Sequence, residues 1–200
     1  MSVNTALESD YKMSIINENI KLKSDSISSS KKCRSKSDKP DLLYREFFML
    51  VSDLIDSDVV QSMDTHIHHN RITTLEHCIS VAFLGFKITR KLNLNSRAAA
   101  RGGLLHDLYL YDWHKTVPPE GLHGFCHPGI ALRNAERYFD LDEREKNIIL
   151  RHMWPMTILW PKYPESLIVS IVDKYCAFAE VFHSKRKSKL KKLKQLITLA

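Results

Sequence analysis

Glycine and proline are scarce in this chain of 200 residues, at 6 and 7 residues respectively. A turn-rich all-β fold needs many residues of both kinds, so their scarcity argues against one. No run of about 18 apolar residues is present, which argues against a membrane-spanning helix. The N-terminus lacks an apolar core followed by a small-residue cleavage site, so we expect no signal peptide.

Cysteine is also rare, and its four copies are widely spaced at Cys33, Cys78, Cys126 and Cys176. They form no CxxC pair, which argues against both a disulfide framework and a zinc site built from thiolates. A reducing compartment, the cytoplasm, is therefore the expected location.

Charge is unevenly distributed along the chain. Of the net +7, residues 1–39 carry +3 and residues 184–200 carry +7, which leaves −3 for residues 40–183. We therefore expect a mildly acidic domain between two basic ends, a poor match for nucleic-acid binding by the domain itself. Residues 1–39 are Ser/Lys-rich and are predicted to be disordered.

The basic extension 184–200 places Leu190, Leu193 and Ile197 on one side of a predicted helix. The apolar stripe is short, which favours a helix that packs its leucines on the domain and solvates its lysines. Contact of this extension with nucleic acid or with a membrane surface is the less favoured alternative.

The middle of the chain predicts an all-α bundle, because apolar residues recur at helical spacing and no useful alternating pattern appears. Segment 63–71 is polar and irregular, and residues 112–126 form a predicted loop marked by "VPPEG". The predicted helices begin at Asp41 as cap, at Thr73 or Thr74 with Glu76 in a capping box, at Asn95 or Ser96, near Pro128, at "DEREKNIILRHM" and at "ESLIVSIVDKYCAFAEVF".

Histidines and carboxylates occur at helix ends or among apolar residues in five of these segments. They are His77, His106, Asp107, His127, which precedes its predicted helix, His152 and Asp173. Imidazole and carboxylate suit Fe, Mn, Zn and Co ions. The first three and Asp173 would hold one metal, His127 and His152 would hold a second, and Asp107 has two oxygens with which to bridge them.

Each of these residues also has an ordinary structural explanation. His77 could face solvent, His106 and Asp107 could form a buried hydrogen-bonded pair, and His152 could complement a helix dipole. His123 competes with His127 for its role. Asp173 could pair with Lys174 or Arg151, although we expect Lys174 to point to another side of the helix. Six coincidences are less plausible than one shared site.

The segments "LEHCISVA", "LLHDLYLYDW", "HPGIALRNAERYF", "NIILRHMWPMT" and "IVSIVDKYCA" together resemble the HD-domain superfamily of metal-dependent phosphohydrolases over about residues 70–180. The run looks most like an uncharacterised bacterial set with "HDLYLYDWH"-type and "KHMWPLT"-type signatures. "HPGIALRNA" is similar to the third-histidine segment of binuclear members, among them the cyclic-di-nucleotide phosphodiesterases and the dinucleoside-tetraphosphate hydrolases, which favours His127 over His123. The Gly-Tyr-Pro motif of the cyclic-di-nucleotide branch is missing, and the usual "HDIGK" becomes "HDLYLYDWHK", which moves the lysine to Lys115.

The resemblance implies a helical fold and a mono- or binuclear site that hydrolyses a phosphoester or phosphoanhydride through a metal-activated hydroxide. The expected substrate is a nucleotide or another small phosphorylated compound. Fe or Mn is the favoured metal, with Zn, Co, Ni or Mg as alternatives. Asp107 would bridge the metals and orient the hydroxide, Lys115 would stabilise charge on phosphate oxygens, and Arg71 and Arg133 would also bind the substrate.

Several other residues are open to two interpretations. Tyr109, Tyr111 and Trp113 could stack on a base or close the core, and a core role is expected for at least one of them. Among the histidines of "THIHHN", His69 could lie at the mouth of the site, although an exposed polar loop is favoured. Two further functions stay open: a non-catalytic HD-like module that binds a nucleotide or a partner, and a binuclear-iron oxygenase.

Overall fold

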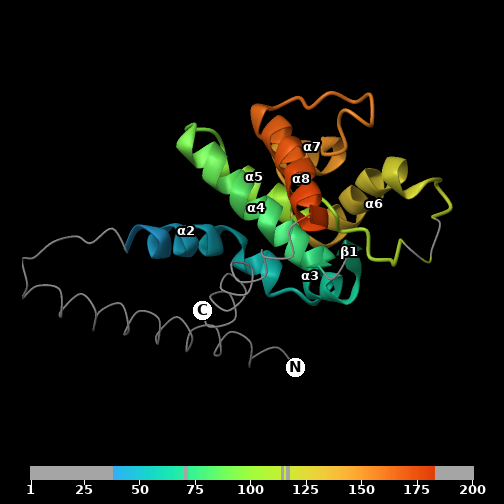
Figure 1. The fold of residues 1–200 in the computed structure, drawn as a ribbon, viewed down its shortest axis with the longest axis horizontal. Coiled ribbons are helices and arrows are strands. Elements are labelled where there is room, and N and C mark those ends of the chain that lie inside the picture. Colours follow the sequence, from blue (N-terminus) through green and yellow to red (C-terminus); the bar gives the residue numbers. More distant parts are fainter. Residues whose placement is uncertain (1–37, 70–71, 114, 116–117, 183–200) are drawn as a thin grey trace, which may run out of the picture. The chain divides into compact units, whose positions relative to one another are not determined.

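The computed structural model describes residues 38–69, 72–113, 115 and 118–182 (Figure 1). The predictions of a disordered N-terminal tail and a basic C-terminal helix, and the candidate Arg71, lie outside these residues. The contacts within the chain divide it into two units, Met1–Lys39 and Pro40–Ala200. The fold described below belongs to the second unit, except that the first helix begins two residues earlier, at Asp38.

Helices hold most of the described residues, which confirms the predicted all-α class. In chain order the elements are α2 (Asp38–Ile55), α3 (Asp58–Gln61), the 3-10 helix η1 (Ser62–Thr65), β1 (Ile67–His69), β2 (Ile72–Thr73), α4 (Thr74–Lys91), α5 (Ser96–Leu105), α6 (His123–Tyr138), α7 (Glu143–Arg151) and α8 (Pro164–Phe182).

Two helices begin at capping residues predicted from the sequence, Thr73 and Asn95, and a third has a cap that was not predicted. Thr73 caps α4 in a reciprocal box, since its hydroxyl accepts from the Glu76 amide while its own amide donates to the Glu76 carboxylate, both at 3.2 Å. The Asn95 side chain accepts from a backbone amide in the first turn of α5. Asp142 caps α7 in the same reciprocal way. Each cap satisfies backbone donors that would otherwise lack a partner at a helix start.

Two helix starts were predicted wrongly. Helix α2 begins at Asp38 rather than after Asp41, because Pro40 falls in its first turn, where a missing amide hydrogen costs nothing. Helix α6 begins at His123 and contains Pro128 in its second turn. His127 therefore lies inside a helix and not in the loop before it.

The segment before α4 forms a small antiparallel hairpin that was not predicted. β1 pairs with β2 through Ile67 opposite Thr73 and His69 opposite Ile72. Strands of two and three residues are too short to display an alternating pattern, which is why the sequence reads as irregular here. The hairpin is fastened to the start of α4, where the Thr74 amide donates to the His66 carbonyl at 2.8 Å.

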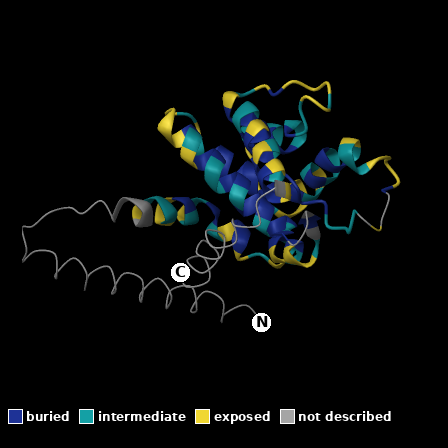
Figure 2. Cartoon of the chain, in the orientation of Figure 1, coloured by how far each residue is buried: buried dark blue, intermediate teal, exposed yellow. Residues whose placement is uncertain are grey.

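Helix α5 lies between α4 and α7, and α8 packs on α4 and on α7 (Figure 1). Small residues allow this close approach: a Cβ on Gly102 would lie 2.9 Å from Ile148, and one on Gly103 would lie 3.0 Å from the Ala82 backbone. Buried residues are concentrated on α4 and α5 in Figure 2. The packing brings the start of α4 and the end of α5 against α8, where the candidate site lies.

Two of the negative expectations can be compared with the structure. No helix among the described residues is long and apolar enough to cross a membrane. Cys78, Cys126 and Cys176 are free thiols, so the described cysteines form no disulfide.

Candidate metal centre

The fold gathers all six predicted ligands into one buried cluster. His77 comes from the first turn of α4, His106 and Asp107 follow the last residue of α5, and His127 lies in α6. His152 follows α7, and Asp173 lies in the middle of α8. Each of the six is buried.

One half of the cluster, which we call the carboxylate half, contains His77, His106 and Asp173. The Nε2 atom of His77 lies 3.0 Å from Asp173 Oδ1. The Nε2 atom of His106 lies 3.7 Å from the same oxygen. The three donor atoms therefore surround one small volume.

The other half, which we call the imidazole half, contains His127 and His152. Their Nε2 atoms face each other at 2.8 Å. Both also approach Asp107 Oδ1, at 3.3 Å from His127 and 3.5 Å from His152. Asp107 Oδ2 turns instead to the carboxylate half, where it lies 3.6 Å from His106 Nε2. The two oxygens of one carboxylate thus serve the two halves, as a bridging ligand would.

Backbone carbonyls orient three of the four imidazole rings. The Nδ1 atom donates to Gly103 O in His106 at 2.8 Å, to His123 O in His127 at 2.7 Å and to Ile149 O in His152 at 2.7 Å. A carbonyl can only accept, so Nδ1 carries a hydrogen, and each ring in its neutral form presents the Nε2 lone pair to the cluster. This is the usual arrangement of a metal-binding histidine. Burial works against a charge on His106, but the neighbouring Asp107 outweighs it and raises the pKa of His106 well above its usual range, so a metal bound at this ring displaces a proton.

The donors fit a divalent metal better than they fit one another. Metal–ligand bonds of about 2.1 Å place two ligands of one ion about 3 to 4 Å apart. The distances between donor atoms given above lie in this range except that between the Nε2 atoms of His127 and His152, which is shorter at 2.8 Å. His106 Nε2 and Asp107 Oδ1 are buried yet make no hydrogen bond of normal geometry to any described residue. Two lone pairs face each other between His127 and His152 when both rings are neutral, and a cation between or beside them removes that repulsion.

Electrostatics differ between the two halves. Burial works against a charge on His77, but hydrogen bonds with Asp173 and Glu180 outweigh it and raise the pKa of His77 to about 10. For His152, burial and the neighbouring His106 and His127 lower the pKa well below its usual range. The carboxylate half therefore attracts cations, whereas His152 stays neutral.

Asp107 and Asp173 remain charged despite being buried. Burial alone would raise both pKa values, but His106 lowers the pKa of each carboxyl well below its usual range, with His127 contributing at Asp107 and His77 at Asp173. Both oxygens of Asp107 and Oδ1 of Asp173 are therefore available as anionic donors.

The orientation expected for Lys174 was wrong. Its Nζ atom donates to Asp173 Oδ2 at 3.1 Å and also to the backbone carbonyl of His152. The long flexible side chain curls back across the 100° that separates adjacent residues on a helix. Asp173 Oδ1 still faces the cluster, so this ion pair leaves one oxygen of Asp173 for a metal.

Two of the three cations predicted to bind phosphate, Lys115 and Arg133, are exposed and form ion pairs with carboxylates. Lys115 is 82% exposed and pairs with Asp112 at 2.9 Å, and Arg133 pairs with Glu120 at 2.8 Å.

The three predicted aromatic residues, Tyr109, Tyr111 and Trp113, have different surroundings. Tyr109 is buried in the core, as expected for at least one of the three. Tyr111 donates or accepts a 2.8 Å hydrogen bond with His123 Nδ1, and Trp113 stacks on the His123 ring. His123 in turn stacks on His127, with ring centroids 4.5 Å apart.

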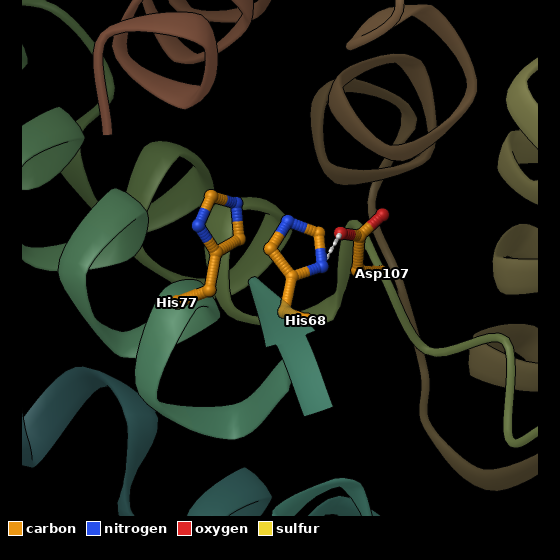
Figure 3. A group of neighbouring side chains, drawn as sticks. All are labelled: His68, His77 and Asp107. Carbon is orange, nitrogen blue, oxygen red and sulfur yellow. Dashed lines mark ion pairs between the residues drawn. The ribbon is translucent and has the colours of Figure 1, made fainter. Parts of the chain in front are cut away.

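Three residues at the cluster were not selected from the sequence. One is Cys78 in α4, whose thiol lies 3.7 Å from His106 Nδ1. His68 in β1 lies beside His77 and Asp107 (Figure 3). Glu180 in α8 accepts from His77 Nδ1 at 2.9 Å and is buried. A signal for Glu180 was present, because it follows Asp173 by seven residues, almost two helical turns, on the same face of an otherwise apolar helix.

A scan against protein families matches a model described as HD domain to residues 74–177, slightly more than half of the chain. Proteins of this family are generally metal-dependent phosphohydrolases. The match confirms the resemblance noted from the sequence at the level of the superfamily. Comparison with curated proteins found no match, and comparison with solved structures found none either.

Proposed function

We propose that this chain, which belongs to the HD domain family, is a metal-dependent phosphohydrolase whose centre takes two divalent ions. One observation carries the proposal: imidazole nitrogens whose orientation is set by backbone carbonyls surround both oxygens of a buried aspartate, Asp107. The proposed ligands are His77, His106, Asp107, His127, His152 and Asp173.

Divalent ions bound there would lower the pKa of a coordinated water to supply the nucleophile and would neutralise charge on a phosphoryl group. Asp107 would help to hold both ions, since its Oδ2 lies toward the carboxylate half and its Oδ1 toward the imidazole half. His106, His127 and His152 would keep their Nε2 lone pairs in place through their carbonyl acceptors. Burial of the cluster would limit the access of bulk water.

The proposed substrate is a small phosphorylated compound, and we favour a nucleotide. Lys115, Arg71 and Arg133 remain the predicted phosphate contacts. For Lys115 and Arg133 this requires that a phosphate compete with Asp112 and Glu120 for their ion pairs. Lys174, which lies at the cluster itself, is an additional cation within the site. Fe or Mn as the metal and the cytoplasm as the compartment also remain predictions.

The full chain, purified without chelator, tests the proposal through its metal content and through phosphate release from a panel of nucleotides and other phosphoesters. Asp107→Asn is the matched inactive variant, because it keeps the shape and removes the bridging charge. Bound metal with phosphate release that is lost in Asp107→Asn supports the proposal. Protein that binds no metal would favour a non-catalytic binding module, and bound metal with oxygen consumption but no phosphate release would favour an oxygenase.

A further inference from the structure

We propose that His68 is a further ligand of the metal centre and binds a divalent ion together with His77 and Asp107. The inference rests on the proposed function, since it requires that the cluster hold metal. It adds an imidazole from the hairpin before α4, outside the residues that match the family model.

The position of His68 places its ring inside the cluster. The side chain is buried, and its ring stacks on that of His77 with centroids 4.1 Å apart and planes 25° apart. Figure 3 shows His68 between His77 and Asp107, with a ring nitrogen turned toward the carboxylate. One donor atom from each of the three residues lies within 4.8 Å of the others.

The distance to Asp107 distinguishes a shared ion from a direct contact. His68 Nδ1 lies 3.8 Å from Asp107 Oδ2, which is too long for a hydrogen bond. Two donors on one ion, each about 2.1 Å from it, lie about 3 to 4 Å apart. His106 Nε2 lies 3.6 Å from the same oxygen. His68 therefore lies about as far from Asp107 as His106, a predicted metal ligand, does.

The backbone holds His68 in this place. Thr74, the first residue of α4, donates to the His66 carbonyl through its amide, and β2 pairs with β1 just beyond. The strand that carries His68 is thus tied to the helix that carries His77, and a ligand on such paired elements keeps its position better than one on a free loop. With His68 bound, the ion of the carboxylate half has fewer positions left for water than the ion of the imidazole half.

Cobalt titration of the full chain tests this assignment, because the visible bands of Co²⁺ respond to the number and kind of its ligands. His68→Ala and the less disruptive His68→Gln are compared with wild type and with His66→Ala, a histidine two residues earlier on the same segment. We expect both His68 variants to bind Co²⁺ at least about tenfold more weakly and to shift its bands, and His66→Ala to match wild type. Added imidazole should restore the wild-type bands in His68→Ala.

Thermal unfolding in chelator verifies that each variant is folded, and His68→Gln carries the test if His68→Ala is not. Wild-type affinity and bands in a folded His68 variant would overturn the inference and leave the proposed function standing. A wild-type chain that binds no Co²⁺ would overturn both.

Discussion

The two halves of the cluster use the same donor atoms in different electrostatic settings. In the carboxylate half, His77 lies between two carboxylates, Asp173 on Nε2 and Glu180 on Nδ1. In the imidazole half, the Nε2 atoms of His127 and His152 face each other, and the Nδ1 atom of each ring donates to a backbone carbonyl. The first half therefore favours any cation, whether a proton or a metal, while the second offers neutral lone pairs and depends on Asp107 for its negative charge.

Asp107 is the one residue that both halves share, so its substitution should have the largest effect. We expect Asp107→Asn to lose both ions and to reduce phosphate release by more than about 100-fold, since even residues that only orient ligands cost up to that much. Metal content by mass spectrometry and the initial rate measure this. Retention of two ions per chain would contradict a bridging role.

Substitution of one half at a time should separate the two ions. We expect Asp173→Ala to remove the ion of the carboxylate half and His152→Ala to remove that of the imidazole half, each leaving about one ion per chain bound. Equilibrium dialysis with Mn²⁺ gives the stoichiometry, and Asp53→Ala, on an exposed carboxylate that binds Arg101, is the matched control. Loss of both ions from either variant would indicate one strongly coupled site instead of two halves.

The sequence predicts the six ligands because each occupies or adjoins a segment of recognisable helical pattern, and the capping residues Thr73 and Asn95 locate two of the helix starts. It does not predict His68, because strands of two and three residues carry no periodic signal. The start of α6 is missed because Pro128 resembles a first-turn proline although the helix accommodates it later.

Contacts between residues far apart in the chain also cannot be predicted from the sequence. Glu180 and His77 are 103 positions apart, and only the packing of α8 on α4 brings them together. Lys174 was expected to point away from Asp173 because helical geometry places Cβ atoms and not the ends of long side chains. The spacing of residues in the sequence therefore identifies the candidate metal donors. The packing of the helices determines which other groups orient these donors and neutralise their charge.

Glu180 should matter to the carboxylate half alone. If its carboxylate orients His77 for a metal, Glu180→Gln should weaken binding of the ion of the carboxylate half about 10- to 100-fold. Glu180→Ala should weaken that binding further, because the amide oxygen of Gln can still accept from His77 Nδ1 and the Ala side chain cannot. Glu165→Gln, at a buried glutamate near the other end of α8, is the control. Tighter metal binding in Glu180→Gln would mean that the two carboxylates hold a structural imidazolium at His77.

Metal affinity should depend on pH to different degrees in the two halves. The change in affinity for one pH unit is the smallest of the effects predicted here. A metal takes only the neutral ring of His77, whose pKa is raised to about 10 in the metal-free chain, so binding there must release a proton at any lower pH. Affinity of the carboxylate half should thus rise about tenfold per pH unit for each proton displaced, up to about pH 10. His152, with its pKa below the usual range, has no proton to release near neutral pH. Calorimetry of Asp173→Ala and His152→Ala in buffers of different ionisation enthalpy counts the protons for each half, and equal counts would show that the contrast between them is not electrostatic.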